Sequence, residues 1–100
     1  DEALSGEGAR DADVLWHRAR LHYMTAKERL RDDKKMQLPV FKAGLEMARR
    51  ALAAAEDNAD AHKWVAIMAN EVGQLSDKKT LVQAGNEFQK HTLRAMELRP

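Results

Sequence analysis

Two helices meet in one short stretch of this chain: Arg50-Ala51-Leu52-Ala53-Ala54-Ala55-Glu56-Asp57-Asn58-Ala59-Asp60-Ala61-His62-Lys63-Trp64. The first part ends a helix, the polar residues interrupt it, and a second helix opens towards the aromatic Trp64. The chain itself ends on the same basic–Ala–apolar motif, at Arg94-Ala95-Met96. Two helices that finish alike indicate a repeated helical hairpin, and arrays of such repeats serve mainly to bind other molecules.

Composition favours a single small helical domain. The 100 residues are 44% hydrophobic and include only two prolines and five glycines. A chain of this length buries roughly two thirds of its unfolded surface, which is enough for one modest core. The net charge is +1, so bulk charge predicts no affinity for nucleic acid.

The chain has no cysteine, which excludes disulfides, thiolate zinc sites and cysteine nucleophiles and is compatible with a reducing cytosol. No stretch approaches the ~18 apolar residues of a membrane span, and the N-terminus lacks the apolar segment of a signal peptide. The chain begins at Asp1 rather than Met and ends where a repeat would continue. We therefore expect a cytoplasmic fragment of a longer repeat array, without a membrane segment.

Apolar spacing predicts four helices. Residues 1–10 carry two glycines and little periodicity, so we expect a flexible lead-in followed by a helical domain over 11–100. Asp11 or Asp13 can cap the first helix, and Pro39 suits the first turn of the second helix. Between them, the charged run 32–35 is predicted to be a solvated turn. The predicted buried stripes are Trp16, Ala19, Tyr23, Ala26 and Leu30 on the first helix, and Phe41, Gly44, Leu45, Ala48, Ala51, Leu52 and Ala55 on the second.

The third helix, predicted over about 61–72, has the least polar surface, so we expect it to be the most buried. Asn58 or Asp60 can cap it, and Gly73 is well placed as its C-terminal stop. Ser76 or Asp77 can cap the fourth helix, whose apolar stripe is Leu81, Ala84, Gly85, Phe88, Thr92, Ala95 and Met96.

The repeat length follows by subtraction from Ala51 to Ala95, 95 − 51 = 44 residues. A tetratricopeptide unit has about 34 residues, so the hairpin order and the ending fit that unit while the length does not. We predict an all-α fold of tetratricopeptide-like helical hairpin repeats, an α–α superhelix with four main helices.

Catalytic and metal sites are not indicated. His17 and His22 are five residues apart, about 140° around a helix, whereas a helical metal pair needs a spacing of four. The sequence contains no Gly-rich phosphate loop, GxSxG turn or HExxH motif. We therefore predict no enzymatic activity, no metal and no cofactor.

The segment His62-Lys63-Trp64 allows two interpretations. It could expose an aromatic ring and a cation at a repeat junction. Alternatively, Trp64 packs in the core while His62 bonds to a neighbouring helix or loop, which we favour because buried aromatics dominate core energetics. The same interpretation applies to Trp16, Tyr23 and His91.

Basic residues give the better functional signal. A charged, solvated face is the default interpretation, and the alternative is a surface that attracts an acidic polymer or tail through weak, salt-sensitive contacts. Nucleic acid is disfavoured because no aromatic residues interleave with the basic ones. The candidate partner-binding residues are Arg18, Arg20, Arg49, Arg50, Lys78 and Lys79.

Four motifs in combination resemble the regulator of microtubule dynamics family, over about residues 11–100. They are Asp13-Val14-Leu15-Trp16-His17-Arg18-Ala19-Arg20, Ala48-Arg49-Arg50-Ala51-Leu52, His62-Lys63-Trp64-Val65-Ala66, and Phe88-Gln89-Lys90-His91 followed by Ala95-Met96-Glu97-Leu98-Arg99-Pro100. Val65 replaces the usual Tyr of the family and Gln89-Lys90 replaces Lys-Glu, but neither change disturbs a helix-facing apolar position. The family-signature residues, which we expect to be structural, are Trp16, Arg20, His62, Lys63, Trp64 and His91.

The resemblance implies a microtubule-associated protein that acts at the mitotic spindle in chromosome segregation. It implies tubulin as the partner and a location on the cytoskeleton, at the spindle and the spindle poles. We hypothesise that basic helix surfaces meet the acidic C-terminal tails of tubulin. The rival hypothesis is a peptide-binding tetratricopeptide adaptor for a different protein.

Solenoid repeats usually need about three units to bury a continuous core, and this chain has about two. We therefore expect apolar surface on the helix that begins near residue 77, and self-association, or swapped packing, through that surface.

Overall fold

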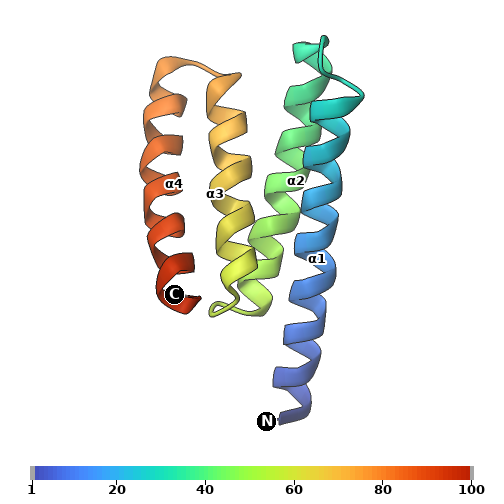
Figure 1. Ribbon diagram of the computed structural model, residues 1–100, viewed down its shortest axis with the longest axis vertical. Coiled ribbons are helices and arrows are strands. Elements are labelled where there is room, and N and C mark those ends of the chain that lie inside the picture. Colours follow the sequence, from blue (N-terminus) through green and yellow to red (C-terminus); the bar gives the residue numbers. More distant parts are fainter. Residues whose placement is uncertain (1, 100) are drawn as a thin grey trace.

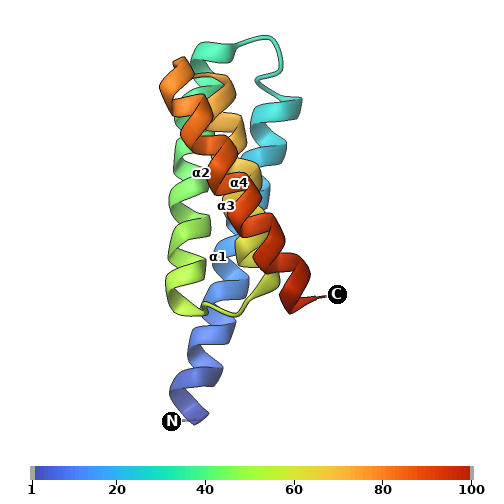
Figure 2. The same cartoon turned by 90° about the vertical axis from the view of Figure 1, so that its left-hand side faces the viewer.

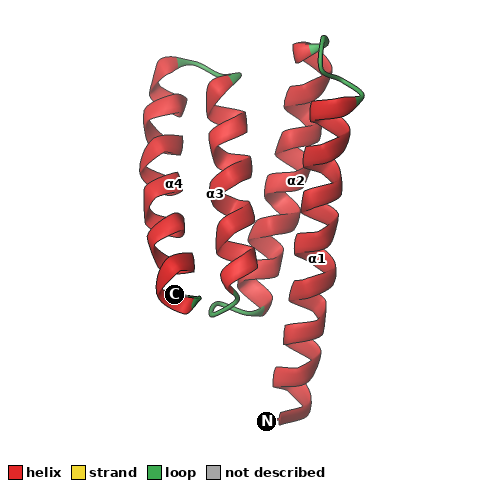
Figure 3. Cartoon of the chain, in the orientation of Figure 1, coloured by secondary structure: helices red, strands yellow, loops and turns green. Residues whose placement is uncertain are grey.

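The computed structural model describes residues 2–99, with side chains for residues 10–99. Four helices account for nearly all of this part of the chain: α1 (Glu2–Glu28), α2 (Lys34–Ala54), α3 (Ala59–Gln74) and α4 (Lys78–Leu98). No strand occurs among the described residues (Figure 3). The all-α prediction with four main helices is confirmed.

The helices form two antiparallel hairpins, α1–α2 and α3–α4, which stand side by side (Figure 1). The two hairpins meet because α3 packs across both α1 and α2, whereas the backbone of α4 lies close only to α3. Figure 2 shows α4 crossing in front of α3. This order places the α1–α2 and α3–α4 connections at the same end of the molecule (Figure 1).

Small residues let the two helices of each hairpin approach closely. They recur every seven residues, a spacing that returns to nearly the same face of a helix. On α1 this stripe is fully buried, and 47 residues later (59 − 12 = 47) an equivalent stripe appears on α3. The two stripes are Ala12, Ala19 and Ala26 on α1, and Ala59, Ala66 and Gly73 on α3. The first helices of the hairpins therefore repeat at 47 residues, and the second helices at 44.

The core lies between the hairpins, where α3 fills the groove between α1 and α2. Phe41, Val65 and Met68 are its largest fully buried side chains, and nine of the 16 residues of α3 are buried. The prediction that the third helix is the most buried is thus confirmed. The α2 stripe is confirmed as well, with Phe41, Leu45 and Ala48 in the core.

Three side chains cap the helices that follow the turns. Asp33, Asn58 and Asp77 accept hydrogen bonds from backbone N–H groups three residues later, at 3.1, 3.0 and 2.8 Å respectively. Each bond satisfies a donor that has no partner within its own helix. Asn58 and Asp77 were among the predicted caps.

The structure corrects two predicted boundaries. Helix α1 begins at Glu2 rather than near Asp11 or Asp13, so residues 2–10 are helical, and the division of the chain at residue 10 stays a prediction. Pro39 lies inside α2, five residues beyond its first residue, Lys34, rather than in its first turn. The helix starts earlier than expected because the Asp33 cap lets Lys34 open it.

Gly73 is also placed differently from the prediction. It lies within α3, and no glycine of the described chain has a positive φ, so it does not stop the helix through a left-handed conformation. Instead, a Cβ atom at this position would come within 2.5 Å of the Ala84 Cβ atom. Gly73 therefore permits the close approach of α4 to α3.

Candidate functional site

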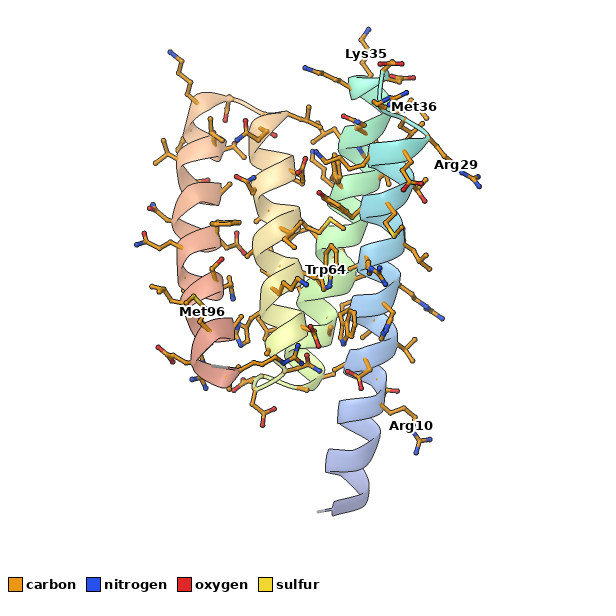
Figure 4. The ribbon with its side chains drawn as sticks, in the orientation of Figure 1. Arg10, Arg29, Lys35, Met36, Trp64 and Met96 are labelled. Carbon is orange, nitrogen blue, oxygen red and sulfur yellow. The ribbon has the colours of Figure 1, made fainter. Side chains whose placement is uncertain are left out.

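One end of the bundle gathers exposed cations from both hairpins. We call this the basic end, and it consists of Arg29, Arg31, Lys34, Lys35, Lys78 and Lys79, all exposed. Figure 4 shows Arg29 and Lys35 at this end, opposite Arg10. A shallow groove here joins the start of α2 to the α3–α4 connection, and a second one lies along residues 31–35.

The basic end carries an excess of positive charge. Its six cations are accompanied by four carboxylates, Glu28, Asp32, Asp33 and Asp77, which leaves 6 − 4 = +2. No ion pair joins any of the six cations to another described side chain. Asp77 holds its charge strongly, because hydrogen bonds from Thr80 lower the pKa of its carboxyl group. A site of this kind attracts acidic partners through salt-sensitive contacts.

The structure does not bring the six predicted partner-binding residues together. Lys78 and Lys79 lie at the basic end, whereas Arg18 and Arg20 lie within α1 and Arg49 and Arg50 towards the end of α2. Arg49 already has a partner within the chain, because its Nη2 atom donates to both carboxylate oxygens of Glu87 on α4, at 3.0 and 3.2 Å.

The run 32–35 was predicted to be a solvated turn, but Lys34 and Lys35 are the first residues of α2 because Asp33 caps that helix. Nothing in the sequence directly indicated that this run shares one end of the molecule with Lys78 and Lys79. The order of the hairpins could have indicated this grouping of cations, because two consecutive hairpins place their connections at the same end of the molecule.

A chain of polar contacts links the α2–α3 connection to α4 and α2. His62 Nε2 lies 2.7 Å from the Glu56 carbonyl oxygen, and His62 Nδ1 lies 2.9 Å from His91 Nδ1. His91 Nε2 in turn lies 4.0 Å from Glu87 Oε1, which pairs with Arg49. The two histidines of separate sequence motifs therefore form one contact between α3 and α4.

The hydrogen-bond acceptors around His62 and His91 determine which ring nitrogens carry a hydrogen. A carbonyl oxygen can only accept, so His62 Nε2 carries a hydrogen, and neutral His62 then offers Nδ1 as an acceptor to the Nδ1–H of His91. His91 Nε2 is left as the place for an added proton, facing Glu87. Burial lowers the pKa of His91, and its neighbour His62 lowers it further, against the opposing effect of Glu87. The folded chain thus favours neutral His91.

The aromatic ring of Trp64 packs in the core. Trp64 is 6% exposed, lies between the helices (Figure 4) and packs edge-on against Tyr23. Lys63 remains exposed and extends over the Trp64 ring. The prediction that Trp64 packs in the core while His62 bonds a neighbouring loop is confirmed.

Trp16 anchors the junction between α1 and α3. Its Nε1–H donates to Asp13 Oδ1 at 2.9 Å, and the side-chain amide of Asn58 donates to the same oxygen at 3.2 Å. These two hydrogen bonds lower the pKa of Asp13, and the bond from Trp16 has the larger effect. Since Asn58 also caps α3, this contact ties the start of α3 to α1.

Two grooves border α4. The α2–α4 groove, about 810 Å³, has α3 as its floor and mixes apolar residues such as Leu52 and Val65 with charged ones. The α3–α4 groove, about 360 Å³, lies between those two helices and is mostly apolar, with Ile67, Phe88 and Met96 in its lining. Phe88 and Met96 are 40% and 63% exposed, which confirms the expected apolar surface on the fourth helix.

Two of the motifs contribute contacts between the hairpins, since Asp13 accepts a hydrogen bond from Asn58 and Arg49 donates to Glu87. Comparison with known proteins assigns the chain to a family. A sequence profile described as "Regulator of microtubule dynamics protein 1-3" matches residues 2–100. The chain belongs to the regulator of microtubule dynamics family. This confirms the resemblance drawn from the motifs, and the family is known for a role in microtubule dynamics rather than for a chemical reaction.

Individual relatives give the same assignment. The chain is 34% identical over 92 residues to "Regulator of microtubule dynamics protein 1" of Pongo abelii, covering 92% of this chain and 29% of that protein. It is 33% identical to the protein of the same name from Bos taurus, with the same coverage. "Regulator of microtubule dynamics protein 3" of Xenopus laevis is 33% identical over 57 residues, which is 57% of this chain and 12% of that protein.

The chain spans less than a third of the length of these relatives. No solved structure matches it. Within the described residues, the helices are too short or too polar to cross a membrane, and no group of three or more His, Asp or Glu side chains there is arranged to hold a metal ion.

Proposed function

We propose that this chain is a microtubule-binding scaffold that acts at the mitotic spindle in chromosome segregation. In this proposal its partner is tubulin, and it works in the cytoplasm on the cytoskeleton, at the spindle and its poles. Family membership supports a microtubule-related role. The observation that carries the binding mode is the basic end, where six exposed cations lie among the described side chains without an ion pair.

The mechanism we propose is electrostatic. The basic end meets an acidic tail of tubulin, while the packed hairpins hold its cations at fixed positions. Lys78 and Lys79, two of the predicted residues, belong to this surface. Arg18, Arg20 and Arg50 are exposed and can add contacts, whereas Arg49 must first leave Glu87.

Charge reversal at the basic end tests the mechanism. Lys78→Glu with Lys79→Glu changes the charge by four units at the start of α4, where acidic residues are well tolerated by the helix dipole. We expect affinity for microtubules to fall by about tenfold at low salt, since each lost contact contributes about 1 kcal/mol or less in water.

The control is Arg10→Glu with Lys90→Glu, which makes the same change in net charge away from the basic end. Both side chains are exposed and make no ion pair with a described residue. An equal loss of affinity in both variants would mean that net charge, not the basic end, governs binding.

The second candidate function is a peptide-binding adaptor for a protein other than tubulin. The α2–α4 groove, about 810 Å³, favours it. Leu93 lines this groove and is 53% exposed, so Leu93→Glu should leave the fold intact. Loss of partner binding in this variant, with a weak response to salt, would favour the adaptor.

We also propose that the chain self-associates through the apolar face of α4. The support for this is the exposure of Phe88 and Met96 beside the α3–α4 groove.

A further inference from the structure

The first hairpin shows how a groove of this fold is filled. The α3–α4 groove is lined on its α4 side by Phe88, Thr92, Ala95 and Met96, which lie 44 residues after Gly44, Ala48, Ala51 and Leu52. In the first hairpin these positions are covered by α3. Ala48 belongs to the core cluster that contains Trp64, Val65 and Met68, and Ala51 belongs to a cluster with Ala61. The α3–α4 groove is thus the repeat equivalent of the groove that α3 occupies.

The α3 side of the groove obeys the same relation. Ala59, Lys63 and Ala66 line it, 47 residues after Ala12, Trp16 and Ala19. Ala12 and Ala19 are fully buried, and each packs in a cluster that contains residues of α3. Both walls of the open groove therefore have counterparts that a helix already covers.

Helix α3 covers the groove of the first hairpin, and one face of α1 corresponds by repeat position to the face of α3 that does so. α3 enters its groove with Ala61 and Met68, and the residues 47 positions earlier are Val14 and Leu21. Both are apolar and exposed on α1, at 46% and 63%, and Met24 beside them is 38% exposed. We define the outer face of α1 by Val14, Leu21 and Met24. Val14 and Leu21 match Ala61 and Met68 of α3 in position and in apolar character, and these two positions carry the correspondence. Polar or charged residues stand at four other buried positions of α3, with His17, Arg18, His22 and Thr25 in place of Trp64, Val65, Ala69 and Val72.

Charge favours this docking, and size sets how closely it can occur. Arg18 occupies the position equivalent to Val65, and Glu97 that equivalent to Ala53, and Val65 and Ala53 both line the α2–α4 groove. When the outer face of α1 docks as α3 does, Arg18 of one copy approaches Glu97 of the next, which already pairs with Arg94. Phe88 stands where the first hairpin has Gly44, and a Cβ atom at Gly44 would already lie 2.8 Å from the Met68 Cε atom. The docked helix therefore lies further from α4 than α3 lies from α2, even though Leu21 is shorter than Met68.

From this correspondence we propose that copies of this chain stack head to tail, with the outer face of α1 of one copy in the α3–α4 groove of the next. The inference rests on the self-association proposed above and names its second surface. The two surfaces differ, so the contact is heterologous, and each copy added leaves one of each surface free. It is weaker than the internal contact, since His17 stands where α3 has Trp64.

Matched substitutions test the proposal, because Leu21 and Met96 are equally exposed, at 63%. Leu21→Lys blocks the outer face of α1, and Met96→Lys blocks the groove. Val82→Lys, at a position 65% exposed on α4 that does not line the groove, serves as the control. Sedimentation equilibrium of each purified chain across a concentration series gives the mass, and circular dichroism verifies the fold.

We expect the mass of the unmodified chain and of the Val82→Lys chain to rise with concentration past that of a dimer. Leu21→Lys and Met96→Lys alone should each stay at the 11.3 kDa of one chain. Mixed in equal amounts, they should form a complex of twice that mass and no larger, because each supplies the surface that the other lacks.

Two results would overturn the proposal. Association lost in Met96→Lys but kept in Leu21→Lys would mean that α4 faces pair with each other, which keeps self-association and removes the head-to-tail contact. A constant 11.3 kDa at all concentrations would remove both. Neither result bears on microtubule binding, which is measured separately.

Discussion

The close approach of α4 to α3 at Gly73 makes a sharp prediction about stability. A Cβ atom at this position would lie 2.5 Å from the Ala84 Cβ atom and 3.3 Å from the Leu81 Cα atom, well inside the 3.5–4.0 Å of an ordinary carbon contact. Neither neighbour is the end of a flexible side chain, so the Gly73→Ala substitution must push α4 away from α3.

The magnitude follows from two opposing terms. Alanine is better than glycine inside a helix by about 1 kcal/mol, whereas overpacking a close contact costs about 1–3 kcal/mol. We expect Gly73→Ala to lower the free energy of unfolding by about 1 kcal/mol. Gly85→Ala, with no atom within 4 Å of the new Cβ, has only the helix term and should raise the free energy of unfolding by about 1 kcal/mol.

Urea unfolding followed by circular dichroism measures both variants against the unmodified chain. The difference of about 2 kcal/mol between them should also appear as roughly 8–16 °C in Tm for a domain of this size. Adding Ala84→Gly to Gly73→Ala removes the clashing atom, so the double variant should be more stable than the sum of the two single effects. If Gly73→Ala proves as stable as Gly85→Ala, the helices are not in the contact described.

Three further predictions follow from single contacts. Because the folded chain holds the pKa of His91 below its ordinary 6.5, the unfolded chain binds that proton more tightly, so stability is full above pH 6.5 and falls as the pH drops towards the lowered value. His91→Gln keeps a donor for His62 and should show a smaller fall in the urea midpoint between pH 7.5 and 5.5, and an unchanged slope would contradict the assignment. Asn58→Ala removes the cap of α3 and the bond to Asp13 and should cost about 1–2 kcal/mol in urea unfolding, more than the same change at an exposed non-capping residue. Pro39→Ala supplies the N–H that α2 lacks and should raise stability by about 1 kcal/mol or more, and a loss of stability would show that the ring packs favourably.

Much of the fold can be predicted from the sequence because it depends on interactions between residues close together in the chain. Asn58 and Asp77 cap helices through their own short side chains, and the spacing of Phe41, Leu45 and Ala48 already places them on one buried face. These features need no knowledge of what packs against them, and the structure confirms them.

The misplaced features depend on partners distant in the sequence. Gly73 has the spacing of a helix stop, but its role is set by Ala84 on the next helix. Pro39 has the position of a first-turn proline, but Asp33 caps the helix earlier. The sequence rule is sound in each case, and a competing contact overrides it.

The candidate site was the least predictable part for the same reason. The sequence does not distinguish a free cation from a paired one. Arg49 pairs with Glu87 because α4 lies across a groove from α2, which only the packing of both helices on α3 determines. The contact between His62 and His91 likewise depends on the register of α3 against α4. Lateral register between helices is fixed by core packing, which spacing along one helix does not encode.

The central functional claim is that exposed cations at the basic end bind the acidic tails of tubulin. Co-sedimentation of this chain with intact microtubules and with microtubules whose acidic tails have been removed tests it most directly. We expect binding to intact microtubules that weakens as salt rises, and a loss of most binding when the tails are absent. Equal binding to both kinds of microtubule would contradict it.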